Sequence, residues 1–139
     1  MERRSFVKQC MVLSAIGISS GSLLSACAAF KTVPFNEQDQ EINIAKADLP
    51  EIEHKIAVIY PKQLSYPVAI SKTENGYQAL LMSCTHQGAV LNAYGSQLIC
   101  EAHGSTFTAD GTVNQGPAKM NLKSFATQES STHISILLK

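Results

Sequence analysis

The chain has 139 residues, and its 11 lysines and arginines balance 11 aspartates and glutamates, so the formal net charge at pH 7 is zero. A neutral chain without a basic block does not have the composition of a nucleic-acid-binding protein, and no nucleic-acid partner is expected. The length allows one small domain in addition to any targeting segment.

Residues 1–26 are predicted to be a targeting signal rather than part of the fold. Arg3 and Arg4 form a twin-arginine pair, and residues 11–24 are an apolar run diluted by serine and glycine. A membrane-spanning helix needs about 20 predominantly apolar residues, and this run is too short and too polar for one. The alternative interpretation is an ordinary secretory signal, which also begins with positive charge.

Cys27 is the predicted lipidation site. Residues 24–27, Leu-Ser-Ala-Cys, resemble the bacterial lipobox, whose cysteine is lipidated and becomes the first residue after cleavage. The alternative is a small buried residue at the end of an uncleaved anchor helix. Residues 27–40 include Pro34 and show no periodicity, so they are predicted to be the lipidated cysteine and a flexible tether for a domain of residues 41–139.

From residue 41 onward the pattern predicts one short strand after another. Asn75 and Gly76 are a hairpin signal between two of these strands. Alternating or β-branched runs predict strands at 41–44, 55–60, 68–71, 77–82, 97–99, 107–108, 112–113, 122–127 and 133–137. No ten-residue amphipathic helix pattern follows the signal, so the expected fold class is all-β.

Two short cysteine–histidine units follow two of these strands. Cys84 and His86 form a C-x-H unit, and Cys100 and His103 form a C-x2-H unit. A glycine comes after each unit, where a backbone must bend tightly or approach something bulky. Two thiols and two imidazoles on a pair of tight loops are a set of four metal ligands.

The mixture of ligands in each unit bears on the choice of metal. Structural zinc sites usually pair like with like, as C-x2-4-C and H-x3-5-H. A two-iron cluster, with two cysteines on one iron and two histidines on the other, needs each loop to reach both irons. Zinc stays an alternative. A Cys84–Cys100 disulfide is another alternative, because export compartments are oxidising. A disulfide would not explain why His86 and His103 stand at matching positions after the two cysteines. The remaining histidines, His54 and His133, are interpreted as solvated or capping residues.

These four positions, the glycines after them and Ser105 resemble the motif of the Rieske iron–sulfur family, with a context of roughly residues 41–139. The resemblance implies small antiparallel sheets or a β-sandwich, with a cluster-binding subdomain of two loops. It also implies one [2Fe-2S] cluster per chain, with Cys84 and Cys100 on the buried iron and His86 and His103 on the outer iron. One-electron transfer requires no catalytic residue of this chain.

Departures from the family pattern are informative. Ala89 and Ala102 stand where Rieske subunits of quinol-oxidising cytochrome bc complexes have a disulfide, so the loops must be held by packing and hydrogen bonds. Ser105 matches a serine that donates to a bridging sulfide in high-potential members, but Phe107 replaces a donating tyrosine. An intermediate potential is therefore expected. Gln87 is polar where quinol-docking members are usually apolar.

Together these features predict a periplasmic Rieske protein that is exported by the twin-arginine route and tethered to a bacterial membrane by lipid. It would transfer single electrons, as a carrier or as a small subunit of an oxidoreductase, to a redox protein that the sequence does not identify. One alternative is the Rieske subunit of a quinol-oxidising bc-type complex, which would keep its N-terminus as an anchor. The other is a zinc-binding structural lipoprotein.

Overall fold

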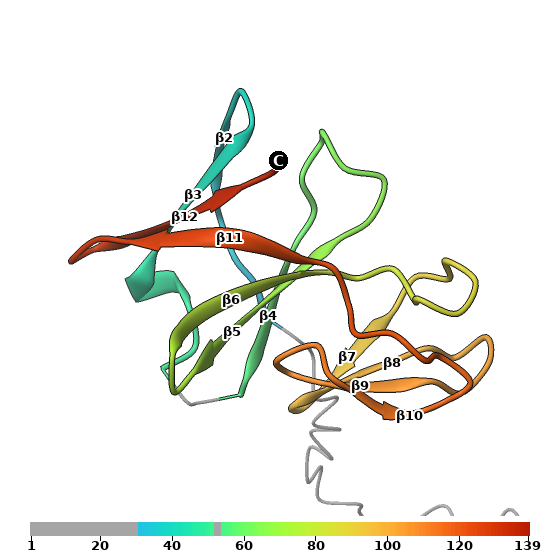
Figure 1. Ribbon diagram of the computed structural model, residues 1–139. Helices are drawn as coiled ribbons and strands as arrows, with labels where there is room; N and C mark the ends of the chain where they lie inside the picture. The colour runs from blue at the N-terminus through green and yellow to red at the C-terminus, as the bar shows by residue number, and fades with distance from the viewer. Residues whose placement is uncertain (1–30, 52–53) are drawn as a thin grey trace, which may run out of the picture.

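The computed structural model describes residues 31–51 and 54–139, and these form two β-sheets (Figure 1). The elements are β1 (Lys31–Thr32), β2 (Asn36–Gln38), β3 (Glu41–Ala45), the short 3₁₀ helix η2 (Lys46–Asp48), β4 (Ile56–Ile59), β5 (Val68–Thr73), β6 (Gly76–Leu81), β7 (Asn92–Tyr94), β8 (Gln97–Ile99), β9 (Thr106–Thr108), β10 (Val113–Gln115), β11 (Ser124–Glu129) and β12 (His133–Leu137). Within these described ranges, no helix has the length and apolar character needed to cross a membrane.

The larger sheet has eight strands in the order β1-β4-β5-β6-β11-β12-β3-β2. Its pairs are antiparallel except for β1 with β4, which run parallel. Alternation explains the burial pattern of β3 and β12, since Ile42, Ile44, Ile134 and Ile136 point into one aliphatic core and their neighbours point outward. The predicted all-β class is confirmed by this sheet and by the smaller one.

The smaller sheet has four antiparallel strands in the order β10-β9-β8-β7. Leu98 and Phe107 are fully buried in it and share a second core with Cys84 and Cys100. The loops that follow β6 and β8 and the segment after β10 come together at one end of the molecule (Figure 1). The potential ligand loops are therefore carried by the smaller sheet and supported by its core.

Strand β4 joins the two cores. All four of its residues are buried, because Ala57 and Ile59 face the aliphatic core of the large sheet while Ile56 and Val58 face the core that contains the cysteines. Ser71 of β5 adds a polar link, since its buried hydroxyl donates a hydrogen bond to the Ala109 carbonyl oxygen at 2.6 Å. The two sheets therefore pack as one body around this pair of strands.

The predicted tether is wrong for residues 31–40. Residues 31–40 belong to the fold: β1 pairs with β4, β2 pairs with β3, and the Val33 side chain is 2% exposed. The Glu37 carboxylate also accepts hydrogen bonds from the backbone N–H groups of Lys62 and Gln63, both at 3.1 Å. The sequence pattern missed these strands because they are short and polar, although β2 forms a tight hairpin with the neighbouring β3. Residues 1–30, with the predicted signal and Cys27, lie outside the described residues.

The other strand predictions agree with the structure to within a few residues. The Asn75–Gly76 hairpin is confirmed, with Gly76 at φ +108° and β5 paired to β6 along their whole length. Strand β7 is absent from the sequence prediction, since Asn-Ala-Tyr has no period that distinguishes it from the loop before it. Strand β7 forms because its backbone pairs with β8, and its own residues give no signal for a strand.

Candidate metal-binding loops

The first loop connects the end of β6 to β7 and carries Cys84 and His86. Its backbone closes on itself, because the Cys84 N–H donates to the Ala89 carbonyl at 2.8 Å and the Gly88 N–H donates to the Cys84 carbonyl at 2.7 Å. Gly88 has φ +73°, in the left-handed region that favours glycine. The loop is therefore a tight turn whose shape depends on that glycine.

The second loop connects β8 to β9 and repeats this closure. The Cys100 N–H donates to the Ser105 carbonyl at 2.8 Å, and the Gly104 N–H donates to the Cys100 carbonyl at 2.8 Å. Gly104 has φ +78°, close to the value of its counterpart in the first loop. The two loops thus have the same backbone frame although their histidines occupy different positions within it.

The side chains of the four predicted ligands fall into an inner pair and an outer pair. The cysteines lie inside, with Cys84 2% and Cys100 0% exposed, and both are free thiols. The alternative of a disulfide between them is not what the structure shows. His86 and His103 are exposed, and their ring centroids lie 4.9 Å apart with an interplanar angle of 84°. Each loop therefore brings one cysteine and one histidine to the same end of the molecule.

This arrangement fits a group with two metal centres. Within residues 31–51 and 54–139, no set of three or more cysteine, histidine or acidic side chains gathers around one position suitable for a single ion. A [2Fe-2S] cluster with mixed ligands takes two protein ligands on each iron, so its four ligands need not converge on one point. Two buried thiols beside two exposed imidazoles have the donor types and the spread that such a cluster needs.

The segment 116–121 fastens the two loops to each other. The Thr85 hydroxyl donates to the Met120 carbonyl oxygen at 2.6 Å, and the Ala118 N–H donates to the Ser105 hydroxyl oxygen at 3.0 Å. Ala118 is buried in the core that holds both cysteines. This hydrogen-bonded segment links loops that have no disulfide between them.

Two tyrosines brace the loops from outside. The Tyr66 hydroxyl donates to the Gly88 carbonyl at 2.9 Å, and the Tyr94 hydroxyl donates to Glu101 Oε1 at 2.6 Å. The bond to Glu101, together with the negative charge of that carboxylate, raises the pKa of Tyr94 above its ordinary value. Sequence reasoning missed Thr85, Tyr66 and Tyr94, because no motif marks a bracing group whose partner is brought near only by folding.

Ser105 and Phe107 lie directly beneath the second loop. Both are 0% exposed, and the Ser105 oxygen accepts the Ala118 N–H while its own hydroxyl proton stays available for donation. Phe107 belongs to the same core as the cysteines and has no hydroxyl to donate. The hydroxyl of Ser105 is therefore held in place by Ala118, and donation from it to a cluster stays a prediction.

An all-β fold with two thiols and two imidazoles on matched loops defines a class of protein, the electron-transfer proteins that carry a two-iron cluster. Residues 38–126, more than half of the chain, match the family model of the Rieske [2Fe-2S] domain. The chain therefore belongs to the Rieske family, and it is an iron–sulfur electron-transfer protein that binds a [2Fe-2S] cluster.

Solved structures support the same fold. The plasma membrane Rieske protein PetC3 of the cyanobacterium Synechocystis PCC 6803 is 28% identical, and the match covers 58% of this chain and 84% of that one with a TM-score of 0.50. A chain from the complex of reduced oxygenase and oxidized ferredoxin in carbazole 1,9a-dioxygenase is 18% identical, with coverage of 73% and 96% and a TM-score of 0.56.

More distant likenesses show the fold alone. A mutant naphthalene 1,2-dioxygenase bound to phenanthrene is 19% identical, and the match covers 60% of this chain but 22% of that one, with a TM-score of 0.50. No curated protein sequence matches this chain significantly. These structures share a fold that covers 58% to 73% of this chain, in chains of very different length.

Proposed function

We propose that this chain is an exported, membrane-tethered Rieske protein in which Cys84 and Cys100 bind one iron and His86 and His103 bind the other. The observation that carries the proposal is the division between two buried thiols and two exposed imidazoles at one tip. The bound cluster supplies a site that accepts and releases one electron. The exposed histidines give a partner protein a short route to that site.

The residues around the loops have separate tasks in this proposal. The core that encloses Cys84 and Cys100 keeps water from the inner side of the site, since its members are apolar and almost fully buried. The Ser105 hydroxyl would donate to a cluster sulfur and raise the reduction potential. Phe107 cannot donate, which supports a potential intermediate in the range of roughly −150 to +300 mV for histidine-ligated clusters.

The tether and the export route depend on the segment before the fold. The twin-arginine pair at Arg3 and Arg4 suits a protein that receives its cofactor before export, and Cys27 stands at the end of a lipobox-like sequence. The 28% identity to a plasma membrane Rieske protein supports membrane association. Lipid at Cys27 would attach the chain to a bacterial membrane without a spanning helix.

The partner would be a redox protein that contacts the tip of the molecule. A Rieske-like chain in the carbazole 1,9a-dioxygenase structure is part of an oxygenase–ferredoxin complex, which supports a protein partner for a domain of this fold. Whether this chain is a free carrier or an oxidoreductase subunit is tested by purification from its membrane. A bc-type subunit would keep its N-terminus, so the intact mass separates that alternative from a chain beginning at Cys27.

The deciding experiment is the metal content of the purified full chain together with the electron paramagnetic resonance spectrum of its reduced form. We expect two irons per chain and the low average g value of a histidine-ligated cluster. One zinc per chain without a signal would contradict the proposal and favour a structural lipoprotein. Substitution of His86 or His103 with cysteine should shift the g values toward those of an all-cysteine cluster, which assigns the ligands individually.

A further inference from the structure

The described chain begins directly in the fold, at an edge of the large sheet. Lys31 and Thr32 pair with Ala57 and Val58 of β4, and after three residues the chain adds β2 beside β3 at the opposite end of the strand order. The Glu37 carboxylate fixes this segment through the backbone N–H groups that follow β4. Residues 31–38 are consequently part of the domain and add nothing to the length of a tether.

The distance between the predicted lipid and the fold is therefore limited. Three residues, 28–30, separate Cys27 from Lys31. A chain spans at most about 3.6 Å per residue, so these links reach no further than about 14 Å, whatever their conformation. This step rests on the lipidation of Cys27 in the proposed function. The short segment requires one edge of the domain, the edge that contains the start of β1, to lie close to the lipid headgroups.

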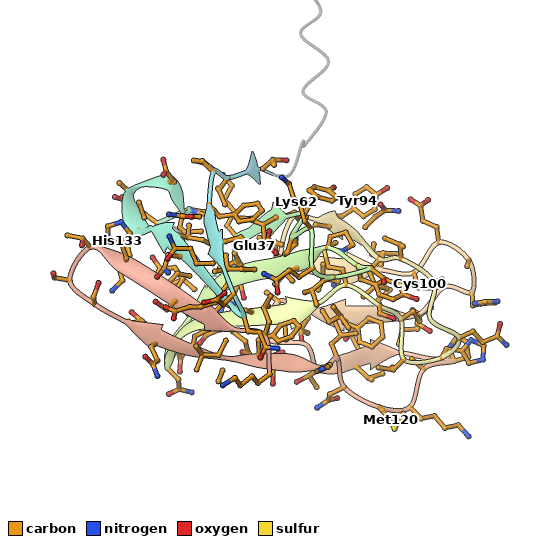
Figure 2. All side chains as sticks on the ribbon, turned by 90° about the horizontal axis from the view of Figure 1, so that it is seen from above. Glu37, Lys62, Tyr94, Cys100, Met120 and His133 are labelled. Carbon is orange, nitrogen blue, oxygen red and sulfur yellow. The ribbon has the colours of Figure 1, made fainter. Side chains whose placement is uncertain are left out.

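The surface at this edge has side chains suited to a membrane interface. Strand β4 contacts both β1 and β7, so Tyr94 at the end of β7 and Tyr60 just after β4 lie near the same edge. They are 48% and 53% exposed, two of the four large apolar side chains that the described surface exposes. In Figure 2, Lys62 and Tyr94 lie on the side of the molecule where β1 (blue) is seen.

Tyrosine and lysine are residue types that favour the headgroup region. The tyrosine ring is apolar with a polar end, and lysine is attracted to anionic lipids. Two carboxylates oppose this charge. Glu37 accepts the backbone N–H of Lys62, and Glu101 accepts the Tyr94 hydroxyl but leaves the tyrosine ring exposed.

We propose that this edge, the anchor face of Tyr60, Lys62 and Tyr94, rests on the headgroups of the membrane that holds the lipid anchor. The second ligand loop borders this face, because Glu101 accepts the Tyr94 hydroxyl, but Met120 beside the loops lies on the opposite side of the molecule in Figure 2. The membrane thus orients the domain and leaves His86 and His103 free for a redox partner. The short tether and the anchor face together hold the domain in one orientation at the membrane.

The absence of tryptophan from the chain allows a direct test. Single variants Tyr94→Trp and Tyr60→Trp are made in the full-length lipidated protein and placed in phosphatidylcholine–phosphatidylglycerol vesicles, with or without brominated acyl chains. We expect brominated lipid to quench both tryptophans and the emission to move to shorter wavelength. Met120→Trp is the matched control, because Met120 is 65% exposed beside the ligand loops, and its emission should not change. Comparing each variant with itself cancels quenching by the cluster.

Several results would overturn the proposal. If the two anchor-face tryptophans are unquenched in protein that floats with the vesicles and contains lipidated Cys27 and iron, the anchor face is wrong and the proposed function stands. Equal quenching at Met120→Trp would also overturn it, because the tip would then lie on the membrane. If the mass of the mature chain shows no lipid on Cys27, both the tether and the anchor face fail.

A longer tether provides a second measurement. Inserting a flexible Gly-Ser linker of about ten residues between Phe30 and Lys31 removes the length limit without changing the surface. We expect quenching of Tyr94→Trp to decrease in this variant, and the added substitution Lys62→Glu to decrease it further. Quenching that neither the linker nor Lys62→Glu changes would overturn the contributions of the short segment and of Lys62.

Discussion

The two ligand loops have one backbone frame and two different placements of histidine. In each loop a glycine comes four positions after the cysteine and donates its N–H to the cysteine carbonyl, with φ near +75° in both. The histidine is the second residue after Cys84 but the third after Cys100. The difference between C-x-H and C-x2-H therefore does not change the size of the loop. It moves the imidazole along the same turn, and the rings of His86 and His103 meet edge to face.

The loops also differ in how they are fastened. The first is held through its Thr85 hydroxyl and its Gly88 carbonyl, which bond to Met120 and Tyr66. The second is held through side chains at Glu101 and Ser105 and through the Gly104 carbonyl, which accepts the Gln115 side-chain amide at 3.3 Å. Segment 116–121 forms hydrogen bonds to both loops, so the loops are linked without a disulfide between them.

Substitution of the inner cysteines should have the largest effect, and it should be equal in the two loops. Cys84→Ser and Cys100→Ser each remove a buried thiol, and the other loop has no further thiol to replace it. We therefore expect iron in the purified protein to fall to near zero. Metal analysis and visible absorbance measure this loss. His54→Asn is the control, because His54 is exposed, lies at φ +61°, and asparagine tolerates that conformation. Normal iron in either cysteine variant would contradict the assignment of the ligands.

Alanine at the loop glycines should show the cost of backbone strain. A left-handed backbone costs a non-glycine residue about 1–2 kcal/mol, so both Gly88→Ala and Gly104→Ala should lower the temperature of cluster loss. The two effects should be similar, because an added Cβ at Gly88 would make an ordinary contact with the Tyr66 hydroxyl at 3.4 Å and the space beside Gly104 is open.

Gly95→Ala is the control for this pair. Gly95 has φ +60° and open space, and it lies in the turn between β7 and β8 away from the ligands. The variant Gly95→Ala should reduce stability only by the cost of the left-handed backbone, and its iron content should stay normal. A larger effect at Gly104 than at Gly88 would show that the two loops are not held as described.

Removing the hydroxyl groups that contact segment 116–121 should have a smaller effect. Ser105→Ala leaves the buried Ala118 N–H without its acceptor, which costs about 1–3 kcal/mol, whereas Thr85→Val removes a more exposed bond worth about 1 kcal/mol. We also expect Ser105→Ala, but not Thr85→Val, to lower the reduction potential in a redox titration. Equal potentials in all three proteins would show that Ser105 does not donate to the cluster.

The bracing tyrosines should give the smallest effects. Tyr66→Phe removes a partly buried bond to Gly88 and should cost about 1 kcal/mol. Tyr94→Phe should change stability less, because that hydroxyl is exposed. Since the pKa of Tyr94 is raised, the stabilisation is complete below the ordinary tyrosine pKa of 10.0 and is lost as pH rises through the higher value.

Ultraviolet titration of tyrosinate checks this order. The pKa of Tyr94 should lie above the ordinary tyrosine value of 10.0 in the parent protein, and Glu101→Gln should lower it. Loss of the difference between parent and Tyr94→Phe below pH 10.0 would contradict the bond to Glu101.

The sequence predicted features that depend on neighbours in the chain. Period-two alternation located β3 and β12, Asn75–Gly76 located a hairpin, and the cysteine–histidine spacing located the loops. It did not predict β2, whose Glu37 is held by backbone groups 25 and 26 residues away. It also missed Tyr66, 22 residues from the carbonyl it bonds. Such contacts have no local signal, because the groups meet only after the sheets have packed.

The position of the last strand affects how the chain is made. β12 lies inside the large sheet, between β11 and β3, and its Ser135 is opposite Asn43, 92 residues earlier in the chain. During synthesis β3 is made long before β12, so this side of β3 stays without its partner until β12 has been made. A variant in which β12 cannot pair would leave two strand edges, on β11 and on β3, open to aggregation.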